Sequence, residues 1–412
     1  MRISKTYYYI LLFAIGFCVS LSVPYLVQIA TYTPPKYPLV LYSSQLKDIV
    51  YINYSDNMCP MTDRKGRKYT TSEFDSLMPL LNYRQLIADG RMPSKIGVFD
   101  SDAKMIRSYQ TSFRISPTRK HQPKHVAYPV FESIPRRVGA INTDYIFSLD
   151  KDVEIYDISL NKLDKEKTQL LKNELLRRNF TFPAQWVIGN TATKKRYDEG
   201  YFVLDADGKL FHMKMVNSRP FVRDTHLTTN SGWHSFHPYE PTLHNFYGIL
   251  ISNDGKLARV NIDDNGSYYV QWLDIPNIDP DIDYVRVLGN LLYWNVTVTK
   301  PEGEYTYALN AWMLSAIDSA FVPAKESTWN KINKWTFPFI IRLKHENSLL
   351  IEPKITDINV NAIWVHILLV GIYAYRKRRH GSHARWYAIV ALLCFGLGAF
   401  LAIAFLPKND IY

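Results

Sequence analysis

Three apolar stretches of membrane-spanning length, one at the start of the chain and two at its end, most constrain what this sequence can fold into. They cover residues 7–30, 358–375 and 386–406. A helix needs roughly 20 largely apolar residues to cross the hydrocarbon core of a bilayer. We therefore expect three transmembrane helices in contact with a lipid bilayer, with residues 31–357 held at one face of the membrane.

The charges that flank these stretches predict their orientation. Residues 1–6 carry two basic side chains, and a basic loop at 376–385 joins the second and third stretches. Short cytoplasmic segments are enriched in Lys and Arg, so both segments are expected in the cytoplasm, and residues 31–357 and 407–412 outside it. The topology-determining residues of the loop are Arg376, Lys377, Arg378, Arg379 and Arg385.

The first stretch has a competing interpretation as a cleaved signal peptide. Its apolar core is longer than such peptides have. Ala30 is the small residue nearest a suitable cleavage point, and Gln28 stands where a second small residue is needed. The prediction is therefore an uncleaved anchor.

The formal net charge of +11 does not indicate a nucleic-acid-binding protein. A good part of it lies in the 376–385 loop, where it sets the topology and can contact anionic headgroups. The other Lys and Arg residues are scattered among Asp and Glu, without zinc-finger spacing or a basic helix. No nucleic-acid partner is expected.

Cysteine usage and motifs give no sign of catalysis. Cys18 and Cys394 lie in predicted membrane segments, which leaves Cys59 alone in the outer region without a disulfide partner. The region is large enough to be stable through its core. The sequence has no Gly-x-Ser-x-Gly motif, P-loop or dinucleotide fingerprint. We expect no enzyme activity and no cofactor.

The middle region is predicted to be mainly β. Segments 200–216 and 246–262 each read as an apolar strand, an Asp-Gly-Lys-Leu sequence and an alternating strand. Gly208 and Gly255 are expected at hairpin turns with positive φ. Their spacing falls within the roughly 40–50 residues of a propeller blade. We expect propeller-like repeats; a stack of meanders or a β-sandwich is the alternative.

Two amphipathic segments predict helices inserted into this β domain. The first covers about 72–88, where Thr70 and Glu73 form a capping box. The second covers about 162–179 and carries leucines on one side and charged residues on the other. Its charged side is expected to face solvent.

The densest polar and aromatic segment is 231–248, which we expect to be an inter-strand loop. Its candidate residues for ligand or partner contact are Trp233, His234, His237, Tyr239 and Glu240. The three-residue spacing of two histidines and the glutamate would suit zinc or copper on a helix, but nearby prolines argue against a helix. The alternatives are a metal-free ligand loop, or buried aromatic rings with histidines bonded to backbone carbonyls; the last is slightly favoured.

The second apolar stretch contains His366, and intramembrane polar groups are a functional flag. We expect it to bond a neighbouring helix. Gly396 and Gly398 in the third stretch suit close helix packing. Spans with so few polar groups do not predict a self-contained transporter, whereas an accessory subunit is compatible with them.

Two segments carry a family resemblance. Residues 69–93 (YTTSEFDSLMPLLNYRQLIADGRMP) and 197–220 (YDEGYFVLDADGKLFHMKMVNSRP) resemble a bacterial inner-membrane family defined only as a domain of unknown function. The resemblance implies an N-terminal anchor, a large outer domain, a C-terminal helical pair and association with ABC-transporter components. It transfers no catalytic residues.

These patterns together predict a non-enzymatic, multi-pass protein of the bacterial inner (cytoplasmic) membrane with most of its chain in the periplasm. We expect an accessory component of an ABC-type transport or envelope-assembly system, with an ABC permease and ATPase as partners. One alternative is an extracytoplasmic hydrolase or metal-handling protein that uses His234, His237 and Glu240. The other is a purely structural membrane anchor.

Overall fold

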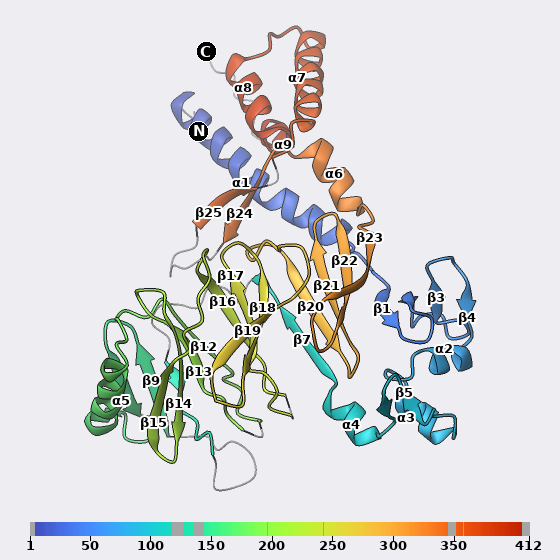
Figure 1. Cartoon of the computed structure of the whole chain (residues 1–412). Helices are drawn as coiled ribbons and strands as arrows, with labels where there is room; N and C mark the ends of the chain where they lie inside the picture. The colour runs from blue at the N-terminus through green and yellow to red at the C-terminus, as the bar shows by residue number, and fades with distance from the viewer. Residues whose placement is uncertain are drawn as a thin grey trace. The chain divides into compact units, whose positions relative to one another are not determined.

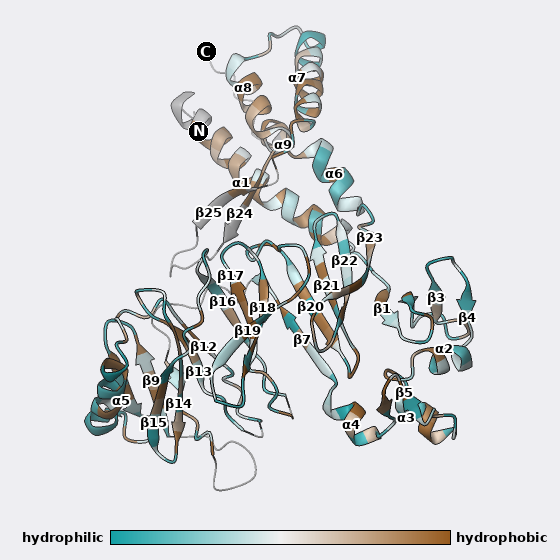
Figure 2. Ribbon diagram, in the orientation of Figure 1, coloured by the Kyte–Doolittle hydropathy of each residue, from teal (hydrophilic) through white to brown (hydrophobic). Residues whose placement is uncertain are grey.

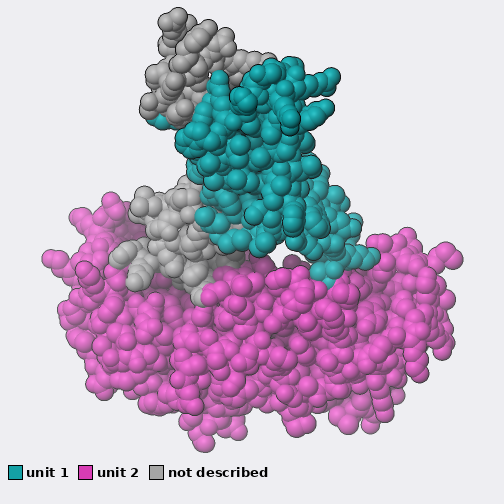
Figure 3. Space-filling view, turned by 90° about the horizontal axis from the view of Figure 1, so that it is seen from above, with its two compact units in different colours: residues 1–36, 324–412 teal, residues 37–323 magenta. Residues whose placement is uncertain are grey.

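The computed structural model shows two compact units (Figure 3). Unit 1 is Met1–Lys36 with Ala324–Tyr412, and unit 2 is Tyr37–Pro323. The described residues are 5–117, 127–134, 144–195, 197–241, 243–344, 352–356 and 358–405.

Unit 2 is built of antiparallel sheets whose strands mostly follow one another in chain order (Figure 1). Sheet A contains β1 (Leu39–Ser43), β2 (Asp48–Ile52), β3 (Met61–Asp63) and β4 (Lys68–Tyr69). Sheet D contains β8 (Tyr128–Pro129), β9 (Tyr145–Leu149), β10 (Val153–Asp157) and β11 (Lys162–Leu163). Sheet E contains β12 (Trp186–Gly189), β13 (Tyr201–Leu204), β14 (Leu210–Val216) and β15 (Arg219–Asp224).

Sheet F contains β16 (Trp233–Pro238), β17 (Gly248–Ser252), β18 (Leu257–Ile262) and β19 (Tyr268–Trp272). Sheet C contains β7 (Thr111–Ile115), β20 (Tyr284–Gly289), β21 (Tyr293–Lys300), β22 (Gly303–Asn310) and β23 (Ala316–Pro323). The early strand β7 pairs with β20, so sheet C combines distant parts of the sequence. The other elements in the described residues of unit 2 are a short hairpin and four helices: β5 (Lys95–Ile96), β6 (Phe99–Asp100), α2 (Thr71–Leu77), α3 (Tyr83–Ala88), α4 (Ala103–Ser108) and α5 (Lys165–Arg177).

Neighbouring sheets share hydrophobic clusters, which form the core of unit 2. Phe147 of sheet D lies in one cluster with Val203 of sheet E. Phe202 of sheet E lies in a second cluster with Leu250 of sheet F, and a third cluster around Ile249 joins sheets F and C. Side chains on both faces of β13 and β17 are buried in this way, which explains why these strands are apolar without alternation.

The predicted repeat corresponds to equivalent hairpins in two neighbouring sheets. Segment 200–216 forms β13 and β14, and segment 246–262 forms β17 and β18. Gly208 and Gly255 have φ of 80° and 82°, which confirms the prediction of positive φ at both turns. The mainly β prediction is also confirmed, but over the residues described the sheets are not shown to close into a propeller or a barrel.

The inserted helices follow their local sequence signals. Thr70 and Glu73 form the predicted capping box at the start of α2. The single helix predicted at 72–88 is wrong, because α2 ends at Leu77 and α3 begins at Tyr83. Pro79 accounts for the break, since the residue before a proline is disfavoured in the helical region. The second predicted helix is confirmed as α5, which Figure 2 shows as mainly hydrophilic on its outer side.

Unit 1 contains the terminal helices. Among the residues that the structure describes, one helical segment, Ile10–Thr31, is long and apolar enough to cross a membrane. It forms most of α1 (Lys5–Thr31). The other elements of unit 1 are α6 (Thr328–Thr336), β24 (Ile340–Lys344), β25 (Glu352–Thr356), α7 (Ala362–Arg379), α8 (Trp386–Phe395) and α9 (Leu397–Phe405).

The second and third apolar stretches form shorter apolar helices than predicted. The last turn of α7 consists of the basic residues Arg376–Arg379, so its apolar part is shorter than the helix. The third stretch is interrupted at Gly396, where φ is 50° and α8 passes into α9. The multi-pass arrangement is therefore not shown by helix length and composition.

The helices of unit 1 pack closely where small residues occur. A Cβ atom added to Gly398 of α9 would lie 2.8 Å from the carbonyl oxygen of Gly16 in α1, so only a hydrogen fits there. His366 of α7 is buried, and its Nδ1–H donates to the carbonyl oxygen of Leu393 in α8 at 2.9 Å. This bond confirms the expectation that His366 contacts a neighbouring helix.

Candidate functional site

The predicted contact segment begins as a strand rather than a loop. Trp233 and His237 both lie in β16, which pairs with β17. The loop prediction is wrong there because a β-bulge between Trp233 and Ser235 interrupts the alternation that identifies a strand. Trp233 is buried and donates its Nε1–H to the carbonyl oxygen of Leu227 at 3.0 Å.

The remaining predicted side chains have different neighbours. The His237 ring stacks on Phe113 of sheet C, with 5.3 Å between centroids. The ring of Tyr239 packs on the same phenylalanine. His234 Nε2 lies 4.0 Å from Asp281, and Glu240 joins a buried polar network on the side of sheet E.

The two histidines and the glutamate therefore do not converge on one point. Across the described part of the chain, no group of three or more His, Cys, Asp or Glu side chains is placed to hold a metal ion. The aromatic rings of Trp233 and His237 contribute to packing between strands and sheets. Of the five predicted residues, Glu240 is the one that leads to a candidate site.

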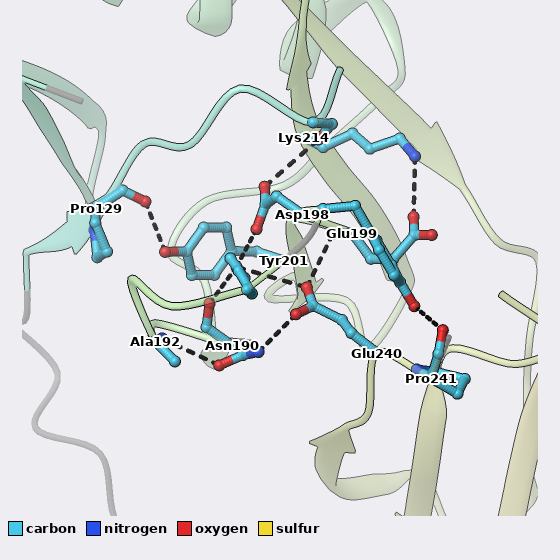
Figure 4. Close-up of polar contacts among 12 residues, drawn as sticks. Pro129, Asn190, Ala192, Asp198, Glu199, Tyr201, Lys214, Glu240 and Pro241 are labelled. Carbon is cyan, nitrogen blue, oxygen red and sulfur yellow. Dashed lines mark hydrogen bonds and ion pairs between the residues drawn. The ribbon is translucent and has the colours of Figure 1, made fainter. Parts of the chain in front are cut away.

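Glu240 belongs to a buried ionic network beside the β12–β13 loop of sheet E (Figure 4). Its carboxylate accepts hydrogen bonds from Asn190 Nδ2 at 2.6 Å and from the backbone N–H of Glu199 at 3.0 Å. Lys195 lies 3.5 Å from the same carboxylate and forms a closer ion pair with Asp198. The side chains of Lys195 and Asp198 are 5% and 2% exposed, so this pair is removed from solvent.

Burial raises the pKa of Glu240, against the lowering effects of the Glu199 N–H and Lys195. A carboxyl group with a raised pKa is a candidate general acid. Glu240 is nevertheless enclosed by partners on both oxygens and is not part of the lining of the neighbouring pocket described below. Its position indicates that it fixes the β12–β13 loop to the end of β16.

The loop fixed in this way forms one wall of a pocket between sheets E and F. The cavity has a volume of about 470 Å³. Asp198 and Glu199 reach it from the loop, and His244 and Tyr247 reach it from the connection between β16 and β17. The full lining is Ser133, Ile134, Tyr197, Asp198, Glu199, Lys214, Val216, Phe221, Arg223, His244, Tyr247, Ile262 and Tyr268.

Along strand β14 the side chains change from apolar residues of the core between the two sheets to polar residues at the pocket. Leu210 lies in the apolar cluster, His212 is a fully buried polar residue, and Lys214 lines the cavity. These residues share one face because side chains alternate along a strand. The cavity thus begins where the apolar residues of this face end.

His212 is a buried polar residue on β14, between the apolar core and the pocket. Its Nε2 bonds the carbonyl oxygen of Glu199, which only accepts, so Nε2 carries the hydrogen and Nδ1 accepts from the Tyr268 hydroxyl at 2.6 Å. Burial, aided by the positive charge of Lys214, lowers the pKa of His212 to about 4. The ring also stacks on Phe202, with 4.6 Å between centroids. Both ring nitrogens are satisfied in the neutral form.

The charged side chains around the cavity are paired in an ordered way. Glu199 accepts from Lys214 Nζ at 3.1 Å (Figure 4). Its carboxylate also lies 3.2 Å from His244 Nδ1. The Tyr197 ring stacks on His244, and its hydroxyl donates to the carbonyl oxygen of Pro241. These contacts hold the loop residues that line the pocket in one arrangement.

The sequence contains a partial signal for this site. Three of its residues, Tyr197, Asp198 and Glu199, begin the segment that carries the family resemblance, but spacing alone did not single them out. Lys195, Lys214 and the aromatic rings of β15 and β19 were missed. Lys214 and Phe221 meet through the pairing of β14 with β15, and the packing of sheet F on sheet E brings the Tyr268 ring to them.

The fold and the pocket define a mainly β protein with an apolar N-terminal helix and a cavity between two four-stranded sheets. The chain belongs to the family described as Domain of unknown function (DUF4857), whose model matches residues 39–309. The match covers most of unit 2, including every residue of the pocket. The resemblance to an uncharacterised domain family is thereby confirmed. Comparison with curated proteins and with solved structures gave no match.

Proposed function

We propose that this protein is a bacterial inner-membrane binding protein, anchored through unit 1, that holds a small ligand in the pocket of unit 2. The observation that carries the proposal is the cavity between sheets E and F. Its volume of about 470 Å³ lies within the roughly 300–1,000 Å³ of small-molecule sites. Its lining also has their character, since apolar and aromatic side chains surround a few oriented polar groups.

Binding is favoured over catalysis because the acidic groups around the pocket already have ionic partners. Asp198 is neutralised by Lys195, and Glu199 by Lys214. A catalytic carboxylate must be within reach of the substrate in the correct protonation state. Glu240, whose pKa is raised, does not line the cavity.

The proposed topology has three spans, with unit 2 in the periplasm. It is supported by the apolar composition of α1, α7, α8 and α9, and by the basic residues at the end of α7. The break at Gly396 is compatible with a membrane segment, because irregular backbone is tolerated at membrane depth where protein surrounds it. Protein does surround the break, because Gly396 lies against the His366 side chain and Gly398 lies against the backbone of Gly16.

We extend the proposal to a propeller-like arrangement of unit 2. Sheets D, E and F are consecutive four-stranded meanders, as propeller blades are. The pairing of β7 with β20 ties an early strand to the last sheet. A pocket between two adjacent blades is then a natural consequence of the stacking.

The cellular role that we propose is an accessory component of an ABC-type transport or envelope-assembly system. Its support is the family resemblance of residues 69–93 and 197–220. Unit 2 would bind a ligand and deliver it to an ABC permease and its ATPase. A protein with few intramembrane polar groups needs such partners to move anything across the bilayer.

Affinity purification tests this role. The tagged full chain is expressed at native level, cross-linked in cells and recovered from membranes in mild detergent, and co-purifying proteins are quantified by mass spectrometry. The control is a tagged chain limited to residues 1–36. We expect a permease and an ATPase of the ABC type to be enriched over the control. Recovery of no ABC component would contradict the proposed role.

A further inference from the structure

We infer that the pocket between sheets E and F takes an acidic sugar, whose carboxylate pairs with Arg223. The inference rests on the proposed binding function and names the class of ligand. Arg223 lies on β15 and lines the cavity. Its guanidinium lies over the Tyr268 ring, 5.5 Å from the centroid.

Arg223 differs from the other cations of the site in having no carboxylate partner among the described residues. Lys195 pairs with Asp198, and Lys214 pairs with Glu199. No described carboxylate lies within ion-pair distance of Arg223. A guanidinium offers a planar fork of N–H donors that matches the two oxygens of a carboxylate. The cation–π contact with Tyr268 restricts the guanidinium, and Arg223 lines the cavity in which such a pair would form.

Aromatic side chains supply flat surfaces for a ring-shaped ligand body. Phe221, Tyr247 and Tyr268 line the cavity together with Tyr197. Phe221 and Arg223 are two residues apart on β15, so their side chains leave the same face of sheet E. A ligand ring lying against Phe221 would therefore have its acidic substituent within reach of the guanidinium.

The polar groups of the site favour a hydroxylated ring over a plain aromatic acid. Glu199 presents carboxylate oxygens that accept hydrogen bonds, and its side chain is 19% exposed. His244 beside it is half exposed and presents a second ring nitrogen. Hydroxyl groups both donate and accept, so they are suited to a neighbouring acceptor and imidazole. One carboxylate, several hydroxyls and a ring are the features of an acidic sugar.

A matched pair of probes tests the inference on the full chain in detergent. 4-Nitrophenyl β-D-glucuronide carries a carboxylate where 4-nitrophenyl β-D-glucoside carries a hydroxymethyl group. Both are titrated by isothermal calorimetry into the wild type and into Arg223→Gln, Arg223→Lys, Arg219→Gln and Val216→Trp. Arg219→Gln is the matched control, because it removes a cation from the same strand outside the pocket. Thermal unfolding of each variant verifies that it is folded.

We expect the wild type to bind the glucuronide at least about tenfold more tightly than the glucoside, as a charge-assisted pair provides. Arg223→Gln should abolish this preference, Arg223→Lys should retain part of it, and Arg219→Gln should retain all of it. Val216→Trp, which places a bulky indole in the cavity, should remove the binding of both probes.

Two results would overturn the inference while leaving the proposed function intact. If both probes bind equally and both are lost in Val216→Trp, the pocket binds ligands but Arg223 does not select acids. If neither probe binds the wild type, an acidic sugar is not the ligand class. The partner recovery described for the proposed function is unaffected by either result, so the two failures are distinguishable.

Discussion

The buried imidazole of His212 is expected to make unit 2 sensitive to acid. In the neutral form it donates to the carbonyl oxygen of Glu199 and accepts from the Tyr268 hydroxyl. A protonated ring would be placed in a fully buried position close to Lys214 and Arg223, and Glu199 would offset their charges only in part. Burial and Lys214 therefore hold the folded pKa near 4, below the ordinary value of 6.5.

The sign and size of the effect follow from this difference. Below pH 6.5 the unfolded chain binds a proton at this site that the folded protein does not bind, so stability falls as the pH falls from about 6.5 to about 4. Each pKa unit corresponds to about 1.4 kcal/mol, which gives a loss of roughly 3 kcal/mol over the whole window. The stability that the neutral ring contributes is fully present above pH 6.5.

His212→Gln tests the calculation, because a glutamine side chain also offers one donor and one acceptor and does not titrate. Urea unfolding of the full chain in detergent, followed by tryptophan fluorescence, is measured at pH 7.5 and pH 4.5. The wild type should lose about 2–3 kcal/mol more than His212→Gln between these pH values. The control His226→Asn replaces an exposed histidine two residues after the end of β15 and should behave as the wild type does. Equal losses in wild type and His212→Gln would refute the assignment of acid sensitivity to this ring.

Two further predictions concern the same unit and use the same unfolding assay at pH 7.5. Lys195→Met should lower the free energy of unfolding by about 3–5 kcal/mol, because it leaves the buried carboxylate of Asp198 unpaired. The control Lys172→Met removes a solvent-exposed ion pair and should cost at most about 1 kcal/mol. Similar losses of stability in both variants would contradict the reasoning. Gly208→Ala should lower the free energy of unfolding by about 1–2 kcal/mol, because the backbone at this residue has a positive φ. Gly255→Ala should cost about 1–3 kcal/mol more, because the added Cβ would lie 1.9 Å from a carbonyl oxygen of the β19–β20 connection. Equal costs at the two turns would show that the backbone at Gly255 shifts to relieve this contact.

Local signals in the sequence account well for the elements that depend on a few neighbouring residues. The capping box at Thr70 and the glycines of the two hairpin turns need only local contacts, and all were predictable. The split between α2 and α3 is also encoded locally, in Pro79, but the apolar periodicity continues past this proline and favours one long helix. Strand β16 was missed because a bulge shifts its alternation at Ser235.

The site depends on contacts that no local pattern encodes. Glu240 was selected for its spacing from two histidines, yet its partners are Asn190 and Lys195 from the β12–β13 loop. Arg223 has an ordinary sequence context, and it lies over the ring of Tyr268, which belongs to the next sheet. Such groups become identifiable only when the stacking of sheets E and F is known.

The claim that unit 2 lies outside the cytoplasm underlies the whole proposed function, and reporter fusions in bacterial cells test it directly. Alkaline phosphatase, which is active only outside the cytoplasm, is fused after Ser267 in unit 2 and, in a second fusion, after Gly381 in the basic loop. Green fluorescent protein, which reports the cytoplasm, is fused at the same two positions. We predict phosphatase activity at Ser267 and fluorescence at Gly381. Fluorescence at Ser267 with phosphatase activity at Gly381 would contradict the account.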